Sequence, residues 1–517
     1  MITRTKDNCD IILISGEYWD DHPLSPVGVI ARVLDDKGYR VGIIERPETD
    51  EDFTKLGKPK LFFGVTSGSV DSMVHNYTPM KRLRKDDPYS NIHPMPDRAV
   101  IVYCNALKRL MKGVQIVIGG IESSLRRFAH YDYWDNKIRR SILMDSRADI
   151  LVYGNGEKQV LEIASRLKNG KDLIGIKGTC VLSRDIDESF RVLPSFSDVT
   201  VDPERFLEMQ AAFSIHQNLA QEYNNNYILQ FAYPEYTSAD LDGIFGLNFS
   251  RKMHRDSLLK GMKYSVVTHR GCIGTCSFCS ISMHQGNSII SRSEQSILKE
   301  IESISYIRGF RGYIDDMGGP SANMYGMDCA ECSKGECIDC PKLERGHQRL
   351  ISLMKKARAI VGIKGIYVRS GIRHDLAVDS PEYVKELVAH HISGTLKVAP
   401  EHFSENVLRL MGKYNNKFED FIDMYNELSR GRKQSIRLYL MIGHPGETME
   451  TISKLATRIS KMENIENFQF FTPTPMTVST CMYWTSMNPV TKEKVKVVHD
   501  YNTKKRMKRK ILSVIGH

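Results

Sequence analysis

Short apolar segments alternate with segments of helical period along most of this chain, and the alternation comes in two blocks. In the first block, apolar and helical segments follow one another at 10–15, 27–36, 39–44, 61–68, 99–111, 114–122, 148–157 and 157–167. Apolar runs of this length are typical of strands buried on both faces, and helices between such strands indicate a parallel sheet. We therefore expect an α/β protein with an N-terminal, Rossmann-like parallel sheet over residues 1–195.

The second block begins near residue 263 and repeats more regularly. Six apolar segments, most of them followed by a helical segment, lie at 264–270, 310–319, 365–371, 394–402, 434–447 and 466–475. This pattern predicts a partial (β/α)6 barrel of the TIM type over 263–480, with its site at the carboxyl ends of the strands. Residues 196–262, which are polar and punctuated by proline and glycine, are expected to form a connector, and 481–517 a basic extension.

Three cysteines follow the first strand of the expected barrel, in the segment HRGCIGTCSFC at 269–279. Cys272, Cys276 and Cys279 have the spacing C-x3-C-x2-C. Three thiolates on one loop can hold three irons of a [4Fe–4S] cluster and leave the fourth iron open to a small ligand. The alternatives are a zinc site, which usually takes four ligands from separated pairs, and three unrelated buried thiols. The spacing and the flanking glycines favour the cluster.

A second group of cysteines lies in an insertion at 328–341, after the second strand of the expected barrel. Its members are Cys329, Cys332, Cys337 and Cys340. Four cysteines in twelve residues can bind zinc or an auxiliary iron–sulfur cluster, and the spacing does not choose between them.

Composition narrows the class of protein. The 517 residues are 41% hydrophobic and 26% charged, which is typical of globular proteins. No apolar run reaches the 18 residues that a membrane span needs, and the first ten residues lack the apolar core of a secretion signal. Eleven cysteines are too few for a disulfide scaffold, and seven lie in the two clusters. We therefore expect metal sites, no membrane partner and a cytoplasmic location.

The net charge is +10, and a basic run at 504–510 supplies part of it. Such a run can contact nucleic acid, which leaves an RNA-binding or RNA-modifying factor as an alternative function. A solvated helix end or a frayed tail is the simpler interpretation, because no RNA-reading module accompanies the run.

The cysteine segment resembles the C-x3-C-x-aromatic-C motif of the radical S-adenosylmethionine (SAM) superfamily. Together with GGIESSLRR at 119–127, DMGGPSANMYG at 316–326, KVAPEH at 397–402 and GHPGET at 443–448, it is similar to the YgiQ-type family over most of the chain. The resemblance implies an enzyme that cleaves SAM reductively on a [4Fe–4S] cluster. The 5′-deoxyadenosyl radical formed abstracts hydrogen from a substrate, which the family does not identify. It also implies a reductant such as flavodoxin or ferredoxin.

The resemblance implies roles for further residues at the strand ends. The residues expected to position SAM are Gly318, Gly319, Arg369, Ser370, Glu401 and Gly446, and Phe278 can lie against a flat ligand. The superfamily has Gly-Gly-Glu where this chain has Gly318-Gly319-Pro320, so the glycines carry over and the Glu does not. A basic and aromatic segment at 119–141 is expected either to line the substrate cleft or to pack against the second half.

The resemblance also raises the question of cobalamin, because the family pairs its barrel with a domain like the cobalamin-binding Rossmann fold. The signature of cobalamin binding without its own base is D-x-H-x2-G. Here Asp20-Asp21-His22 is followed by Ser25 where the glycine should be. A cobalamin-dependent radical SAM methyltransferase is therefore an alternative that the sequence leaves open.

Overall fold

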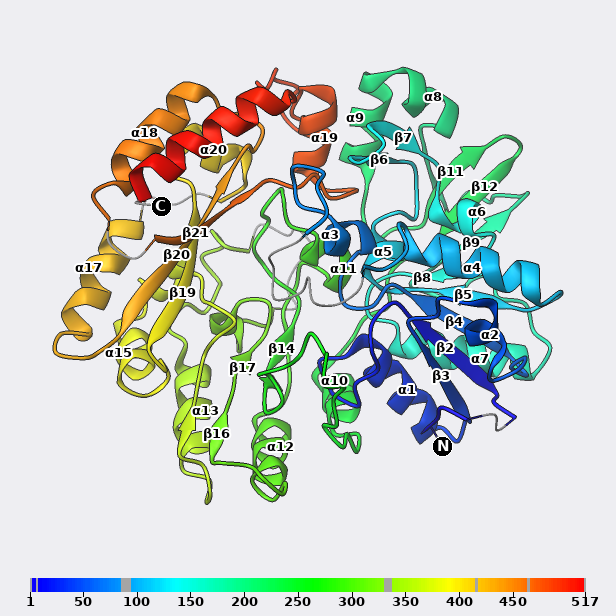
Figure 1. Ribbon diagram of the computed structural model, residues 1–517, viewed down its shortest axis with the longest axis horizontal. Helices are drawn as coiled ribbons and strands as arrows, with labels where there is room; N and C mark the ends of the chain where they lie inside the picture. The colour runs from blue at the N-terminus through cyan, green and yellow to red at the C-terminus, as the bar shows by residue number, and fades with distance from the viewer. Residues whose placement is uncertain are drawn as a thin grey trace.

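The computed structural model describes residues 2–5, 8–84, 94–329, 337–413, 417–462 and 465–515. Two halves of the chain lie side by side (Figure 1). The N-terminal half contains one large sheet with helices on both faces. The second half contains an arc of parallel strands with helices outside it. None of the helices in the described ranges is both long and apolar enough to cross a membrane.

The N-terminal sheet has ten strands, and its first six are parallel. They are, in sheet order, β1 (Ile2–Thr3), β3 (Val41–Glu45), β2 (Ile11–Ser15), β4 (Phe62–Thr66), β5 (Ile116–Ile118) and β8 (Ile150–Val152). Four further strands extend the sheet: β9 (Thr179–Ser183), β12 (Asn226–Gln230), β11 (Leu219–Tyr223) and β10 (Arg191–Leu193). The expected Rossmann-like parallel sheet is confirmed.

Part of the expected connector at 196–262 belongs to this sheet rather than linking two units. β11 and β12 form an antiparallel hairpin whose turn is Asn224-Asn225, both with positive φ. Asparagine tolerates that conformation and is favoured in two-residue hairpin turns. Burial of Leu219, Ala220 and Leu229 holds the hairpin against the sheet. The polar residues around the turn conceal this apolar pairing in the sequence.

Helices α1 (Pro26–Asp36) and α7 (Glu157–Lys168) cover one face of the sheet, and α4 (Ala99–Leu110) covers the other. Helix α1 begins where the side chain of Ser25 accepts a hydrogen bond from the Gly28 amide and Pro26 occupies the first turn. Short helices α5 (Gly120–Ser124) and α6 (Ile142–Ser146) follow strand ends. The carboxyl ends of the parallel strands face the second half of the chain.

The second half contains the six expected strand positions. Parallel pairs join β13 (Val266–Val267) to β17 (Met317–Gly318), β16 (Tyr313–Ile314) to β18 (Gly365–Ile366), and β19 (Thr395–Glu401) to β20 (Ser435–Ile442) and β21 (Ile465–Phe470). A single parallel bridge between Ile372 and Val398 links the second group to the third. Among the described residues no pairing closes this arc, so the barrel is partial, as expected.

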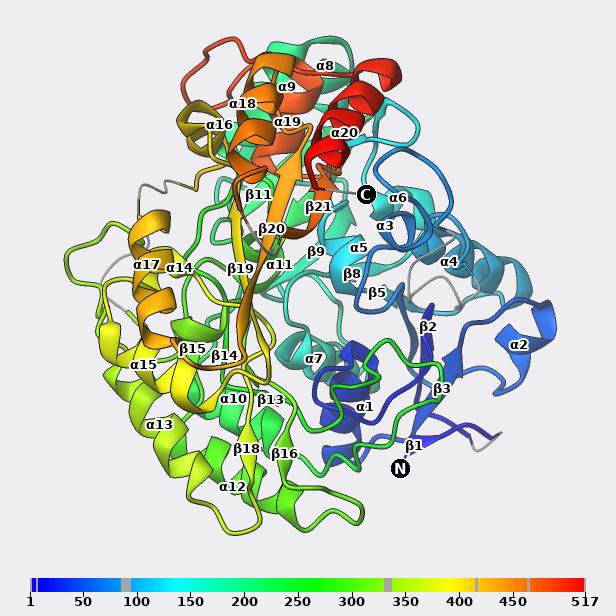
Figure 2. The same cartoon turned by 60° about the vertical axis from the view of Figure 1, so that its left-hand side comes forward.

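Helices lie on the outer side of the arc (Figure 2). They are α12 (Glu294–Ser305), α13 (Gln348–Arg358), α15 (Pro381–His390), α17 (Phe418–Leu428) and α18 (Met449–Ile459). The first four helices share a core with the strands that includes Ile301, Leu353, Leu387 and Phe421, and α18 packs against β20 in a separate core. The strand ends are thereby left open toward the N-terminal sheet.

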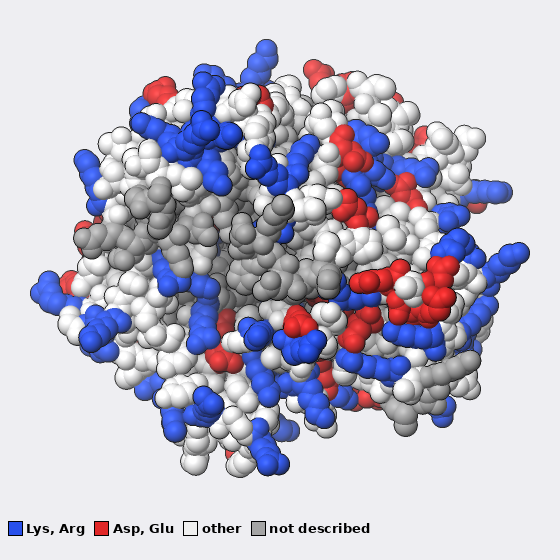
Figure 3. Space-filling view, in the orientation of Figure 1, with Lys and Arg blue, Asp and Glu red and all other residues white. Residues whose placement is uncertain are grey.

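The C-terminal extension forms α19 (Val478–Thr485) and α20 (Tyr501–Ile515). Helix α20 is packed rather than frayed, because Met507 and Ile511 are buried against α18 and β20. The opposite side of α20 is exposed and basic, and Lys and Arg side chains gather over α18 and α20 in the space-filling view (Figure 3).

Candidate functional site

The cysteine loop runs from β14 (His269–Arg270) to α11 (Ile281–Gln285). Its three thiols are half-buried. Gly271 has φ +81°, and a Cβ there would overlap the carbonyl oxygen of Ser288, so only glycine fits. A Cβ on Gly274 would overlap the Arg373 guanidinium. The glycines therefore let the loop turn tightly and bring a cation against the thiols.

Two cations lie near the three sulfur atoms. Nη1 of Arg373 is 3.6 Å from Sγ of Cys276, and Lys413 forms an ion pair of 3.2 Å with Glu401. Burial raises the pKa of Cys272, while Arg373 and Lys413 act in the opposite direction. Burial and the neighbouring thiols raise the pKa of Cys279 to about 12. Iron binding would therefore release protons from these thiols. Arg373 and Lys413 would help to stabilise the thiolates that form.

The donor set fits a [4Fe–4S] cluster with one open iron. Three thiols share one loop and influence one another electrostatically. Within the described residues, no group of three His, Cys, Asp or Glu side chains is arranged to hold a metal ion directly. The fit consequently rests on the chemistry of the donors and on the loop that carries them.

Hydrogen bonds fix the cysteine loop to two distant elements. Ser277 Oγ lies 2.6 Å from the Leu410 carbonyl oxygen, to which it donates, and 2.7 Å from Ser479 Oγ. Ser479 Oγ is in turn 2.6 Å from Nε2 of His444, whose ring packs edge-on against Phe278. Ser277, Ser479 and the contact of His444 could not be predicted from the sequence, because no local pattern joins residues so far apart.

Three of the residues expected near SAM lie together. Gly318, Gly319 and Ser370 line one cavity beside the cysteine loop. A Cβ on Gly319 would lie 2.6 Å from the ring of His269, and one on Gly318 would lie 2.7 Å from Ser370 Oγ. The two glycines therefore allow His269 and Ser370 to approach the backbone closely at this strand end.

Asp316, which the sequence analysis did not single out, organises the neighbouring strand end. Its carboxylate accepts hydrogen bonds from the backbone amides of Arg369 (2.7 Å) and Ser370 (3.1 Å). Burial raises the pKa of Asp316, and these hydrogen bonds oppose the shift. Asp316 thereby holds the segment that presents Ser370 to the cavity.

The other residues expected near SAM lie outside the lining of that cavity. Arg369 is exposed, with its guanidinium 5.8 Å from the centre of the Tyr367 ring. Glu401 has φ +66° and pairs with Lys413, which places it near the thiols. Gly446 donates its amide to the Lys496 carbonyl oxygen at 2.7 Å. In the cysteine-rich insertion, Cys332 lies outside the described residues, Cys329 is exposed, and Cys337 and Cys340 are half-buried.

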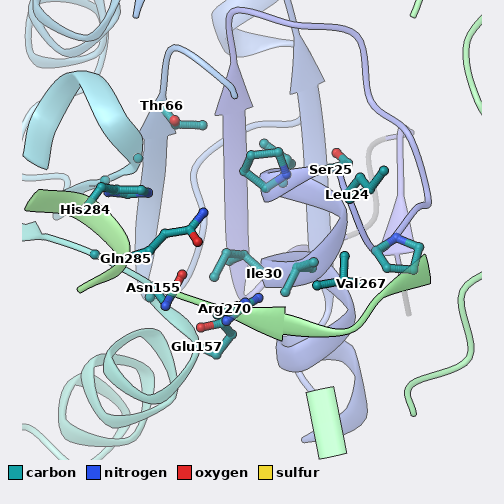
Figure 4. Close-up of a pocket in the computed structure, with 18 of the residues that line it drawn as sticks. Leu24, Ser25, Ile30, Thr66, Asn155, Glu157, Val267, Arg270, His284 and Gln285 are labelled. Atoms are coloured by element: carbon teal, nitrogen blue, oxygen red, sulfur yellow. The ribbon is translucent and has the colours of Figure 1, made fainter. Parts of the chain in front are cut away.

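The cavity has a volume of about 420 Å³ and lies between the carboxyl ends of the N-terminal strands and those of the barrel strands (Figure 4). It continues over the face of the sheet toward α1 and α7, where Phe62, Val117 and Val152 form its wall. Protein interiors are close-packed, so a space of this size is typical of a ligand site. Polar side chains also line it, among them Ser25, Thr66, Asn155, Glu157, Arg270, His284 and Gln285.

The segment Asp20-Asp21-His22 joins the two halves instead of facing the cavity. His22 is fully buried, with Nε2 2.9 Å from the Lys263 carbonyl oxygen and 3.1 Å from Nη1 of Arg251. Burial and Arg251 lower the pKa of His22 to about 4. Asp21 accepts hydrogen bonds from Arg32 and Ser250. His22 is therefore engaged in packing and is not among the residues that line the cavity.

The segment 119–141 is mostly a packing surface. Arg127 is buried between the rings of Tyr153 and Phe213, each 4.5 Å from its guanidinium. Tyr131 stacks on Trp484 of α19, with ring centres 4.8 Å apart. Only Gly119 and Gly120 of this segment line the cavity.

Three family descriptions match the chain in succession. Residues 1–265 match "Radical SAM N-terminal", 266–459 match "Radical SAM superfamily", and 466–514 match a domain of unknown function, DUF3362. The chain is 43% identical over 527 residues to a UPF0313 protein of Methanocella arvoryzae, covering 95% of this chain and 88% of the relative. It is 44% identical over 539 residues to one of Methanocaldococcus jannaschii, covering 97% and 89%.

Two solved structures are similar in fold. The radical SAM methyltransferase TsrM of Kitasatospora setae, with cobalamin and a [4Fe–4S] cluster bound, matches with a TM-score of 0.56 and 17% identity, over 90% of this chain and 77% of that one. The cobalamin-dependent radical SAM enzyme OxsB, with aqua-cobalamin bound, has a TM-score of 0.50 and 12% identity, over 89% of this chain and 54% of that one. Both matches include the N-terminal sheet and the arc of strands, because they cover about nine tenths of this chain.

Proposed function

Because this chain belongs to the UPF0313 proteins, the YgiQ-type family of radical SAM enzymes, we propose that its [4Fe–4S] cluster is bound by Cys272, Cys276 and Cys279. The cluster and SAM together, when bound, supply a 5′-deoxyadenosyl radical. Gly274 and Arg373 help the loop to accept an anionic cluster. Ser277 and Ser479 hold the loop in place.

We place SAM over the strand ends at Gly318, Gly319 and Ser370. Because neither glycine has a side chain, His269 and Ser370 pack directly against this strand end, and all four residues line the cavity. Glu401, near the thiols, is positioned to meet the far end of the same ligand. Arg369 and Gly446 would reach it only from the rim.

The observation that carries the proposal is that one cavity joins this strand end to the N-terminal sheet. A molecule that fills the cavity therefore lies against the expected SAM position on one side and against the sheet on the other. The apolar wall and the polar side chains that share the lining are those of a pocket for a large, mostly apolar ligand.

In a second candidate function, that ligand is a corrinoid, which supplies methyl-transfer chemistry. The fold likeness to TsrM and OxsB favours it, together with the extension of the cavity between the sheet and α1 and α7. Since His22 is held by Lys263 and Arg251, the corrinoid would bind without His22 as a ligand. Glu157 and Arg270 would close over one edge of it.

We also propose a cytoplasmic enzyme that receives electrons from a flavodoxin or ferredoxin. The exposed basic side of α20 is complementary in charge to an acidic reductant. It is complementary to RNA as well. Binding of transfer RNA that weakens with salt and disappears when α20 residues Lys505, Arg506 and Lys508 are changed to Gln would favour the RNA alternative.

The test is anaerobic reconstitution of the full chain with iron and sulfide, followed by reduction and assay for 5′-deoxyadenosine, with and without hydroxocobalamin. We expect wild type to form 5′-deoxyadenosine and Cys276→Ala to lose both iron and product. Cys9→Ala, which removes a buried thiol outside both clusters, is the matched control and should keep both. Retained turnover in Cys276→Ala would contradict the assignment. Counting iron and zinc in the same samples identifies the metal bound by the second group of cysteines. Counting cobalt shows whether the cavity holds a corrinoid.

A further inference from the structure

A histidine that follows the cysteine loop lines the cavity, whereas His22 does not. His284 lies on α11, five residues after Cys279, and lines the cavity. Its side chain and that of Gln285 point from α11 into the cavity (Figure 4). The loop that carries the cluster ligands therefore also carries an imidazole toward the N-terminal sheet.

The ring of His284 is held by one nitrogen only. Nδ1 lies 3.0 Å from Oγ of Ser124, a fully buried residue at the end of α5. Ser124 Oγ also accepts the amide of Gly154 at 3.1 Å, which fixes its position. Among the hydrogen bonds of the described residues none involves Nε2 of His284. In the tautomer whose Nδ1–H is donated to Ser124, Nε2 presents its lone pair to the cavity, as in histidines that bind metals.

The imidazole is neutral at physiological pH. Burial lowers the pKa of His284 to about 4, and Arg127 and Arg270 act in the same direction against the smaller effect of Glu157. A neutral imidazole is a nitrogen ligand for a transition metal and makes no ion pair. The surroundings thus favour the form of His284 that ligates.

The other possible metal ligands that line the cavity are Glu157, Asp316 and His269. Glu157 is paired with Arg270 at 2.7 Å, and Asp316 accepts the amides of Arg369 and Ser370. In the described part of the chain no three His, Cys, Asp or Glu side chains are grouped to hold a metal. A metal that meets His284 must therefore bring its other ligands with it, as the cobalt of a corrin macrocycle does.

We propose that Nε2 of His284 is the protein ligand to the cobalt of a corrinoid bound in this cavity, in the role that the sequence signature would give to His22. The inference rests on the second candidate function above, because it needs a corrinoid in the cavity. It adds that the ligand comes from the cysteine loop and is positioned by Ser124.

The test uses the full chain loaded with hydroxocobalamin, reduced to cobalt(II) and measured by electron paramagnetic resonance. The protein is prepared with natural and with 15N-labelled histidine. A nitrogen ligand from histidine gives a triplet splitting on the cobalt lines in the first sample and a doublet in the second. A triplet in both samples would mean that the base of the cobalamin ligates the metal, and unsplit lines would mean no nitrogen ligand; either outcome overturns the proposal.

Two variants complete the test. In His284→Ala the splitting should disappear while the protein still retains cobalt, because the walls of the cavity are unchanged. His216→Ala, which removes an exposed histidine, should keep the doublet. If wild type retains no corrinoid, the second candidate function and this proposal both fail. If it retains corrinoid and His284→Ala keeps the splitting, only the assignment of His284 fails.

Discussion

Arg270 and Glu157 form an ion pair of 2.7 Å that joins the two halves of the chain in the lining of the cavity. Arg270 lies on β14, which leads into the cysteine loop, and Glu157 is the first residue of α7. Both side chains are largely buried, and the guanidinium also packs over the ring of Phe245. The position of the cysteine loop is thereby coupled to the N-terminal sheet by one charged contact.

The first prediction concerns this pair. Glu157→Gln leaves the Arg270 charge buried without its partner, so we expect the free energy of unfolding to fall by about 3 kcal/mol. Denaturant unfolding of the apoprotein measures this. The matched control is Glu450→Gln, which removes an exposed ion pair with Lys454 and should leave stability unchanged. Equal effects of the two variants would show that the ion pair of Arg270 and Glu157 does not couple the two halves of the chain.

The second prediction concerns Gly319. A methyl group there would lie 2.6 Å from the His269 ring and must displace it, which narrows the strand end where we place SAM. We expect Gly319→Ala to weaken SAM binding to the reconstituted protein by at least about tenfold, or 1.4 kcal/mol, in equilibrium dialysis. Gly243→Ala, in helix α10 (Ser238–Phe245), is the control, because a Cβ there meets no atom within 4 Å. Unchanged SAM affinity in Gly319→Ala would place SAM elsewhere.

The third prediction concerns Arg373, whose guanidinium lies against Cys276. A nearby cation stabilises the more negative, reduced form of a cluster. Arg373→Gln should therefore lower the reduction potential, on the order of 50 mV, which is about 1 kcal/mol for a one-electron couple. Arg373→Lys keeps the charge and should shift the reduction potential less. A redox titration followed by electron paramagnetic resonance measures both, and a higher potential in Arg373→Gln would contradict the role.

The local elements of this fold were predictable, whereas several contacts between distant segments were not. The apolar run at 10–15 became β2, which is buried on both faces, and the run at 434–447 contains β20, in which buried positions alternate with more exposed ones; both patterns can be seen in the sequence. The hairpin at Asn224-Asn225 was missed because its apolar residues are few and its turn is polar. The division of the chain into separate domains stays a prediction.

For the candidate site, spacing on one loop was informative and long-range pairing was not. Cys272, Cys276 and Cys279 could be selected because their ligand chemistry depends on near neighbours. Ser277 and Ser479 are 202 positions apart, and only the fold brings their hydroxyls together. His22 matched part of a known signature, yet Arg251 and Lys263 hold it in the core. A motif thus predicts donors, and the tertiary packing decides which of them reach the cavity.

The last prediction uses a buried lysine to test how α20 is docked. Lys504 is nearly inaccessible, and Nζ lies 2.9 Å from Oη of Tyr483. Burial, with a smaller contribution from Lys81, lowers the pKa of Lys504 from 10.5 to about 8. Between pH 8 and 10.5 the unfolded chain binds the proton more tightly than the folded one, so this group makes stability rise with pH across that window.

Replacing Lys504 removes both the buried charge and its pH dependence. We expect Lys504→Met to be more stable than wild type at pH 7 by about 1–3 kcal/mol, and the difference to shrink as the pH rises from 8 toward 10. Unfolding curves of both proteins at each pH give the difference, in which the titration of the many tyrosines cancels. Lys505→Met, on the exposed side of α20, should show neither effect. A constant difference across this window would mean that Lys504 is solvated and that α20 is not docked on α19.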